Sequence, residues 1–249
     1  PNKDAFSKNM GFETYDNNRS TRLKELIDQY DKVSYSDFKT IKYDRKYPKP
    51  YAFSWMDINH LDRINPKAYP DIQELIVSLQ TWDRKADANS IGAGVFAVFY
   101  AQLRPYYYQL PPPKIVPPTT LVKALRDTKN YLLKHFNTIE IKLGDYQKLV
   151  RGSKEFAIFG LPDVITAMAA QPFKDGKVKV VSGESYIELV RFSKAGTEIE
   201  SVISYGSSDH PTSPHYGDQM EMYAEFKTKR MSLNKDEVYA TAKRVYHPR

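Results

Sequence analysis

Cysteine is absent from the 249-residue sequence, and this absence excludes several kinds of site at once. Without thiols the chain can form no disulfide, bind no zinc through thiolates and present no cysteine nucleophile. The sequence also lacks any run of about eighteen apolar residues, so no segment is expected to span a membrane. The first thirty residues lack the apolar core of a signal peptide. We expect the chain to be exported only if it is processed from a longer precursor.

Dense blocks of one charge are lacking as well. Lys and Arg outnumber Asp and Glu by 37 to 30, which gives a formal net charge of +7. A basic surface attracts nucleic acid or other acidic partners. The cations are scattered among the acidic residues, however, and no RNA-binding sheet signature appears. We therefore expect no nucleic-acid partner, and a basic, non-enzymatic binding module for an acidic protein stands as an alternative function.

Apolar residues at helical spacing dominate the first two thirds of the chain. The expected helices run from Arg19 after an Asn18 cap to Tyr30, from a Ser36 cap to Tyr43, from Asp71 to Trp82, from Ser90 to Arg104, and from a Thr119 or Thr120 cap to about His135. The fourth is apolar on all sides, which is typical of a buried helix. A proline-rich connector is expected over 105–118.

The last third is rich in branched and aromatic residues instead. Strands are expected over 177–182, 184–193 and 197–205, and "KAGT" between the last two predicts a hairpin. A short helix should begin at Asp218, and Asn234 with Glu237 suits a capping box for a final helix. The fold class is α+β, as one unit over 1–249. We expect residues 1–140 to be helix-rich, 141–205 to be strand-rich, and 206–249 to hold a terminal loop and helices.

The segment "YGSSDHPTSPHYGDQ" (205–219) is the most reactive-looking part of the chain. A metal site could use His210 and His215 with neighbouring carboxylates, but two prolines between them keep the histidines apart. The serines at 207, 208 and 213 could serve a catalytic triad, but none lies in a Gly-x-Ser-x-Gly elbow. The third interpretation, a stiff connector after a strand whose hydroxyls satisfy its own backbone, is favoured.

This segment, extended to "YGSSDHPTSPHYGDQMEMY", resembles the C-terminal signature of the penicillin acylase family. Three further stretches resemble the same family in the same order. These are "YDNNRSTRLKELI" (15–27), "LGDYQKLVRG" (143–152) and "SGESYIELVRF" (182–192). The resemblance is greater to the branch that acts on acyl-homoserine lactones and aculeacin than to the penicillin G branch.

The resemblance implies the C-terminal portion of an N-terminal-nucleophile hydrolase with an αββα core. Such a hydrolase exposes a serine at the start of its large chain, and the serine attacks an amide while its own α-amino group acts as base. A backbone N–H and an asparagine amide stabilise the oxyanion. This chain begins with Pro1, so the nucleophile is expected upstream, and the chain alone should be inactive. Its expected partners are the missing N-terminal portion of the precursor and an acylated amide substrate, and its expected location is periplasmic or secreted.

One candidate catalytic residue follows from the resemblance. Arg19 matches an arginine near the nucleophile, where a guanidinium can orient the amide and lower the proton affinity of the amine. The alternative is an exposed arginine in the first turn of an amphipathic helix, and Arg22 is the second choice for the catalytic role. No cofactor is required. A structural calcium ion is compatible with the resemblance, although Asp4, a candidate ligand, differs in spacing.

Overall fold

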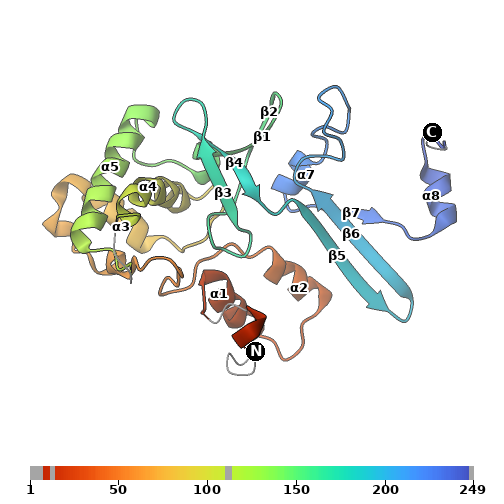
Figure 1. Cartoon of the computed structure of the whole chain (residues 1–249), viewed down its shortest axis with the longest axis horizontal. Coiled ribbons are helices and arrows are strands. Elements are labelled where there is room, and N and C mark those ends of the chain that lie inside the picture. Colours follow the sequence, from red (N-terminus) through yellow and green to blue (C-terminus); the bar gives the residue numbers. More distant parts are fainter. Residues whose placement is uncertain (1–7, 12–14, 110–113, 247–249) are drawn as a thin grey trace. The chain divides into compact units, whose positions relative to one another are not determined.

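The computed structural model describes residues 8–11, 15–109 and 114–246 (Figure 1). By their internal contacts these residues form two compact units. Unit 1 comprises 1–148 and 157–181, and unit 2 comprises 149–156 and 182–249. The architecture is α+β, with helices in the first half of the chain and small sheets with short helices after them, as expected. The sequence predicted a single α+β unit. The grouping by contacts does not measure whether the two units fold together, so this stays a prediction.

The helices of unit 1 agree with the expected segments, with shifted ends. They are α1 (Asn18–Ile27), α2 (Tyr35–Lys42), α3 (Gln73–Thr81), α4 (Ile91–Tyr107), α5 (Pro118–Phe136) and the short α6 (Leu143–Tyr146). Four 3-10 turns accompany them: η2 (Lys8–Met10), η3 (Asn59–Arg63), η4 (Pro66–Ala68) and η5 (Pro70–Ile72). None of the described helices is long and apolar enough to cross a membrane.

The helix caps show where local sequence signals sufficed. Ser90, where the fourth helix was expected to open, is the N-cap of α4, since its side chain accepts a hydrogen bond from the Ala93 N–H. The Asn18 cap was wrong by one residue, because Asn17 forms a reciprocal capping box with Ser20. The Ser36 cap was also wrong. Ser34 is the N-cap of α2, and it forms a capping box with Asp37.

The caps expected for α5 were wrong for a different reason. Pro117 holds the N-cap position and Pro118 opens the helix, so neither Thr119 nor Thr120 is needed there. At the other end of the connector, α4 continues through Pro105 to Tyr107. The connector between α4 and α5 is therefore shorter than the expected range of 105–118. Pro105 removes only its own backbone N–H from the helix, and the two residues after it remain helical.

The core of unit 1 gathers around α4, which is buried over most of its length as its composition predicted. Phe96 on this helix stacks on Tyr51 at 5.7 Å between ring centroids and packs against Trp82 at 5.2 Å. Tyr47 joins the same aromatic group at 5.4 Å from Phe96. Gly94 allows α4 to approach the backbone of Ile141, because a Cβ at this position would lie 2.0 Å from that carbonyl oxygen.

A four-stranded sheet has the order β2-β1-β4-β3. Its strands are β1 (Gln147–Arg151), β2 (Lys154–Ala157), β3 (Met168–Pro172) and β4 (Val178–Gly183). Only β4 was expected from the sequence. β1 and β4 run parallel, a pairing that the sequence did not predict.

Unit 2 is built on the predicted hairpin. β5 (Tyr186–Ser193) pairs antiparallel with β6 (Gly196–Ile203), and β6 also pairs with β7 (Lys229–Met231). Two short helices follow, α7 (Met220–Ala224) and α8 (Lys235–Thr241). α7 starts after Gln219 and not at Asp218. Asn234 caps α8 as expected, whereas the Glu237 carboxylate binds the Ser232 hydroxyl and does not close the capping box.

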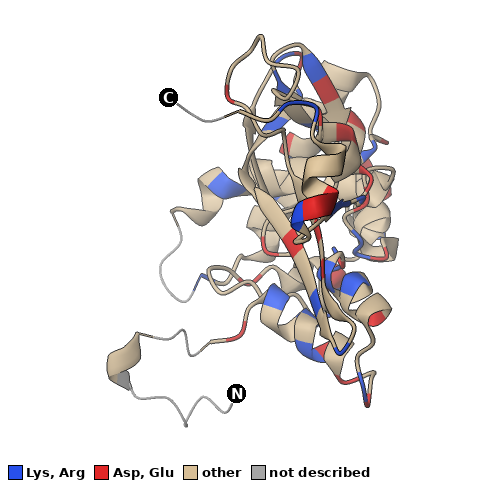
Figure 2. Ribbon diagram, turned by 90° about the vertical axis from the view of Figure 1, so that its right-hand side faces the viewer, with Lys and Arg blue, Asp and Glu red and all other residues tan. Residues whose placement is uncertain are grey.

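Charged residues of both signs are interleaved along the ribbon (Figure 2). Many cations have acidic partners nearby: Arg84 lies 2.5 Å from Asp62, and Arg126 lies 2.7 Å from Asp71. This arrangement is typical of a solvated exterior, and it offers little support for the binding-module alternative.

Candidate functional site

The first residue of α1, Asn18, has a fully buried polar side chain. Its Nδ2 donates to Asp163 Oδ2 at 2.9 Å, and its backbone N–H donates to the same oxygen at 3.2 Å. Its Oδ1 accepts a hydrogen bond of 2.7 Å from the Ala52 N–H. Because Asn17 is the N-cap, Asn18 is turned away from the helix end and binds two distant segments of unit 1 to the start of α1.

Asp163 is the centre of this group. The loop "GLPDV" brings its carboxylate to the start of α1, and the side chain is 1% exposed. Its backbone is left-handed, with φ of 66°, a conformation that aspartate tolerates better than most residues. The buried Tyr47 hydroxyl donates to the Pro162 carbonyl at 2.6 Å and fixes the preceding residue. The position of the carboxylate is therefore set by the surrounding packing.

Arg19, the arginine singled out in the sequence, contacts the same carboxylate. Its Nε lies 3.3 Å from Asp163 Oδ1, and its side chain is 54% exposed. A carboxylate held by buried donors thus anchors the guanidinium at one nitrogen. A guanidinium carries five N–H donors, so within the described part of the chain those of the two terminal nitrogens are left to bind another group. We name Asn18, Arg19 and Asp163 the Asn18 cluster.

Burial raises the pKa of the Asp163 carboxyl, while the Asn18 hydrogen bonds and the positive charge of Arg19 oppose this rise. The net direction is upward. A carboxyl whose folded pKa is raised stabilises the fold most below its unfolded pKa of about 3.9. This contribution is lost as the pH rises through the higher folded pKa.

The stability difference between the parent and an Asp163→Asn variant should depend on pH. The free energy of unfolding of the parent minus that of an Asp163→Asn variant should decrease as the pH rises from about 4 through the raised pKa of Asp163. Urea denaturation at a series of pH values measures this difference. A difference that increases over the same window would mean that the fold favours the ionised carboxylate and that burial does not dominate the pKa of Asp163.

Arg22, the second-choice arginine, has a different environment. Its Nε and Nη2 form a bidentate pair with Asp44 at 3.2 and 3.0 Å, and its Nη1 lies 3.0 Å from Glu25 Oε2. Its side chain is only 16% exposed, and the hydrogen bonds to these carboxylates raise its pKa above the ordinary arginine value despite burial. All three guanidinium nitrogens are engaged, so Arg22 is a structural residue in this arrangement.

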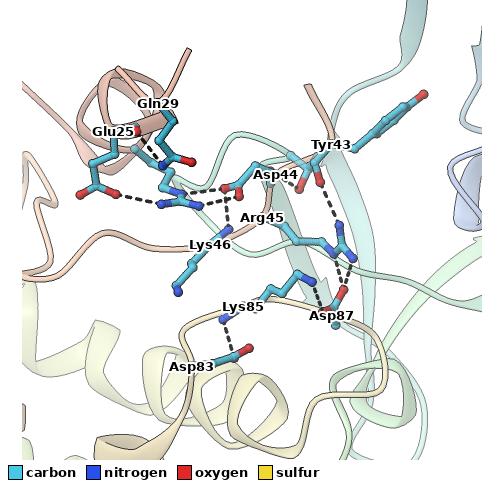
Figure 3. A network of polar contacts seen from close by, with 11 residues as sticks. Glu25, Gln29, Tyr43, Asp44, Arg45, Lys46, Asp83, Lys85 and Asp87 are labelled. Atoms are coloured by element: carbon cyan, nitrogen blue, oxygen red, sulfur yellow. Dashed lines mark hydrogen bonds and ion pairs between the residues drawn. The ribbon is translucent and has the colours of Figure 1, made fainter. Parts of the chain in front are cut away.

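The Arg22 pair belongs to a larger polar network that supports α1 (Figure 3). Asp44 also accepts from the Lys46 N–H at 3.0 Å, and Arg45 binds Asp87 and the Tyr43 carbonyl. Lys85 Nζ lies 3.4 Å from the other oxygen of Asp87. The network connects α1 to the segments around 43–47 and 83–87. These two segments in turn bind the loop that carries Asp163, because the Gly160 N–H donates to the Ala86 carbonyl and the Thr166 N–H donates to the Asp44 carbonyl.

The segment 205–219 in unit 2 has the features of a stiff connector. Its own backbone closes it, with Ser208 N–H donating to His215 O at 3.2 Å and Gln219 N–H donating to Tyr205 O at 2.9 Å. The guanidinium of Arg151 lies 4.4 Å from the Tyr216 ring centroid. These contacts favour the connector interpretation over a catalytic serine.

The metal interpretation of the same segment gains no support. His215 Nδ1 lies 2.8 Å from Asp218 Oδ2, but no group of three or more potential ligands is found in the part of the chain that the structure describes. Asp4 and Pro1 lie outside the described residues. The structural calcium ion therefore stays a prediction.

Sequence reasoning missed Asn18 as a site residue and missed Asp163 altogether. The signal at the first was the doublet Asn17-Asn18, of which only one asparagine can cap the helix. The signal at the second was Pro162-Asp163 after a glycine, since such a turn permits a left-handed aspartate. No sequence pattern indicates that these residues, 145 positions apart, would share a hydrogen bond.

The chain matches the sequence profile of one protein family and is similar to several curated proteins. The sequence profile of the family described as Penicillin amidase matches residues 1–240. An acyl-homoserine lactone acylase PvdQ of Pseudomonas savastanoi pv. phaseolicola is 25% identical over 191 residues, which cover 67% of this chain and 24% of that protein. The protein of the same name from Pseudomonas syringae pv. syringae is 31% identical over 102 residues, 40% of this chain and 13% of the relative.

Among solved structures, this chain is similar to a thermostable penicillin G acylase from Alcaligenes faecalis. The TM-score is 0.49 at 14% sequence identity, and the match covers 98% of this chain and 54% of the other. The chain thus spans about a quarter or less of the length of the curated relatives described above.

Proposed function

Because the chain belongs to the penicillin amidase family, we propose that it is part of an acylase that cleaves the amide bond of N-acylated substrates such as acyl-homoserine lactones or penicillins. The names of the relatives support this substrate class, since the two described proteins are acyl-homoserine lactone acylases. The chain corresponds to only a fraction of their length, so the complete activity belongs to a longer protein. A periplasmic or secreted location is part of the same proposal.

The attacking group of this acylase is an N-terminal serine that lies outside these 249 residues. A serine activated by its own α-amino group needs both groups on one residue, and the chain spans about a quarter or less of the curated relatives. The chain then contributes the Asn18 cluster and the packing around it, and its partner is the remainder of the acylase polypeptide. By itself it hydrolyses no amide.

One observation carries the proposed role of Arg19. Its guanidinium is anchored at Nε by a buried carboxylate, while the side chain remains 54% exposed. An anchored cation costs little reorganisation when negative charge develops on a nearby oxygen, and such preorganised groups lower reaction barriers. Asp163 acts as a positioning residue because it holds Arg19 and touches no reacting atom.

In the complete acylase, Arg19→Ala should lower the turnover number about a hundredfold, the usual effect of removing one preorganised donor. Arg19→Lys should recover little of this loss, because an ammonium does not reproduce the planar guanidinium. The assay is hydrolysis of N-dodecanoyl-homoserine lactone, with thermal unfolding of each variant as a check on folding.

The matched control is Arg126→Ala, which removes an exposed arginine ion-paired with Asp71 on another part of unit 1. Its turnover should equal that of the parent. Near-normal turnover of the Arg19→Ala enzyme would remove Arg19 from the catalytic site. Hydrolysis of the lactone substrate's amide by the 249-residue chain alone would refute the proposal that the nucleophile lies outside this chain.

A further inference from the structure

Unit 1 contains a cavity of about 870 Å³. Its walls include five tyrosines, at positions 100, 107, 108, 131 and 146, together with Trp55. The tyrosines come from α4, α5, α6 and the residue after α4, and Trp55 comes from the segment between α2 and η3. We call this space the tyrosine cavity. Its volume lies within the range of about 300–1,000 Å³ that is typical of small-molecule sites.

The charge of the cavity lining has one sign. Among the described residues that line it, Arg104 is the only charged one and none is acidic. Arg104 Nη2 donates to the Tyr108 hydroxyl at 3.1 Å, a contact that lowers the pKa of Tyr108. Lys114 Nζ lies 4.3 Å from the Tyr107 ring centroid and adds a second cation beside the same tyrosines. An anion is therefore favoured and a cation disfavoured near this part of the wall.

The lining also includes a buried donor. Tyr146 is 3% exposed and lies edge-on to Tyr131 at 6.5 Å between ring centroids. The Tyr131 hydroxyl donates to the Gly176 carbonyl at 2.8 Å, whereas among the described residues no hydrogen-bond partner of the Tyr146 hydroxyl is found. This hydroxyl is not one of the fully buried polar atoms that lack a partner, and it is free to donate a hydrogen bond to a ligand oxygen in the cavity.

The remaining walls are apolar. Met56 and Leu161 face the same space as the aromatic side chains, and Met168 and Val178 contribute from β3 and β4. Apolar walls with a few polar groups are typical of sites that take an amphipathic molecule. As far as its described lining extends, the tyrosine cavity combines such walls with one guanidinium, the Tyr146 hydroxyl and no carboxylate.

We propose that the tyrosine cavity binds an amphipathic carboxylate, with its apolar body against the tyrosine rings and its carboxylate on Arg104. A planar guanidinium matches a carboxylate in geometry as well as charge. None of the residues of the Asn18 cluster lines the cavity, so this site does not depend on the proposed hydrolysis. Binding needs no serine nucleophile and can be measured on the 249-residue chain.

The test is calorimetric titration of the chain with decanoate and, in parallel, with decan-1-ol, both below their aggregation limits. Decanoate should bind in a one-to-one complex about tenfold or more tightly than the alcohol, because a charge-assisted hydrogen bond is lost in the neutral ligand. Arg104→Gln should weaken decanoate about tenfold and leave the alcohol unchanged. Arg126→Gln, which alters an exposed arginine outside the cavity, should change neither ligand.

A second variant locates the ligand. Ala101 lines the cavity from α4, so Ala101→Phe should fill the space and abolish binding of both ligands. Circular dichroism and thermal unfolding check that this variant is folded, and the Arg104→Gln result does not depend on it. The proposal is overturned if decanoate fails to bind, if it binds no tighter than decan-1-ol, or if Arg104→Gln leaves its affinity unchanged.

Discussion

Replacing Asp163 with alanine should lower the free energy of unfolding by about 3 kcal/mol at neutral pH. The substitution leaves the buried Nδ2 and the backbone N–H of Asn18 without their acceptor, and each unsatisfied buried donor costs about 1–3 kcal/mol. Alanine in the left-handed conformation adds about 1 kcal/mol. Removal of a buried carboxylate, which itself disfavours the fold, offsets part of these costs. The ion pair with the half-exposed Arg19 is screened by solvent and contributes little.

The control for this prediction is Asp175→Ala. Asp175 is an exposed aspartate whose backbone is also left-handed, with φ of 55°. It shares the backbone conformation of Asp163 but lacks its buried hydrogen bonds, so its replacement should cost only about 1 kcal/mol. Urea denaturation of both variants isolates the contribution of the Asn18 cluster. Equal losses in the two variants would mean that backbone strain accounts for the whole effect and that the buried hydrogen bonds add nothing.

The sequence predicted the elements whose signals are local. The continuous apolar composition of α4 and the turn between β5 and β6 are each contained in one short stretch of sequence, and both are confirmed. β1 and β3 were missed because "QKLVR" and "MAAQP" have little of the branched or aromatic composition that marks a strand. The place of β1 in a sheet depends on β4, with Gln147 opposite Val178, and no local pattern reports a partner so far along the chain.

The candidate site illustrates the same limit. Arg19 was found through a resemblance carried by neighbouring residues, and the structure gives it a buried anchor. The anchor itself comes from a loop 144 residues further along the chain. A single aspartate in a turn is more often a solvated turn residue than the acceptor of three hydrogen bonds. Only the packing of Tyr47 on that loop and the displacement of the helix cap to Asn17 distinguish the two cases.

Replacing Gly94 with alanine should lower the free energy of unfolding by about 3 kcal/mol, although alanine is the better helix former by about 1 kcal/mol. The added Cβ would lie 2.0 Å from the Ile141 carbonyl oxygen and 2.8 Å from the Lys142 carbonyl carbon. This backbone cannot easily retreat, because the next two residues donate hydrogen bonds to Ser90 O at 3.0 Å and Ala88 O at 2.7 Å. The steric term therefore exceeds the gain in helix propensity.

Gly92, one half-turn earlier on α4, provides the comparison that decides this prediction. A Cβ there would lie 2.4 Å from Trp82 Cγ and 2.7 Å from its Cβ, so the base of one packed side chain must shift, whereas Gly94→Ala displaces a hydrogen-bonded backbone segment with a closer contact. Gly92→Ala should therefore cost less than Gly94→Ala, although both gain the same helix propensity. Chemical denaturation of the two variants gives the order directly. If Gly94→Ala were as stable as the parent or more so, α4 would not lie against the 141–142 backbone, and the packing described for the centre of unit 1 would be wrong.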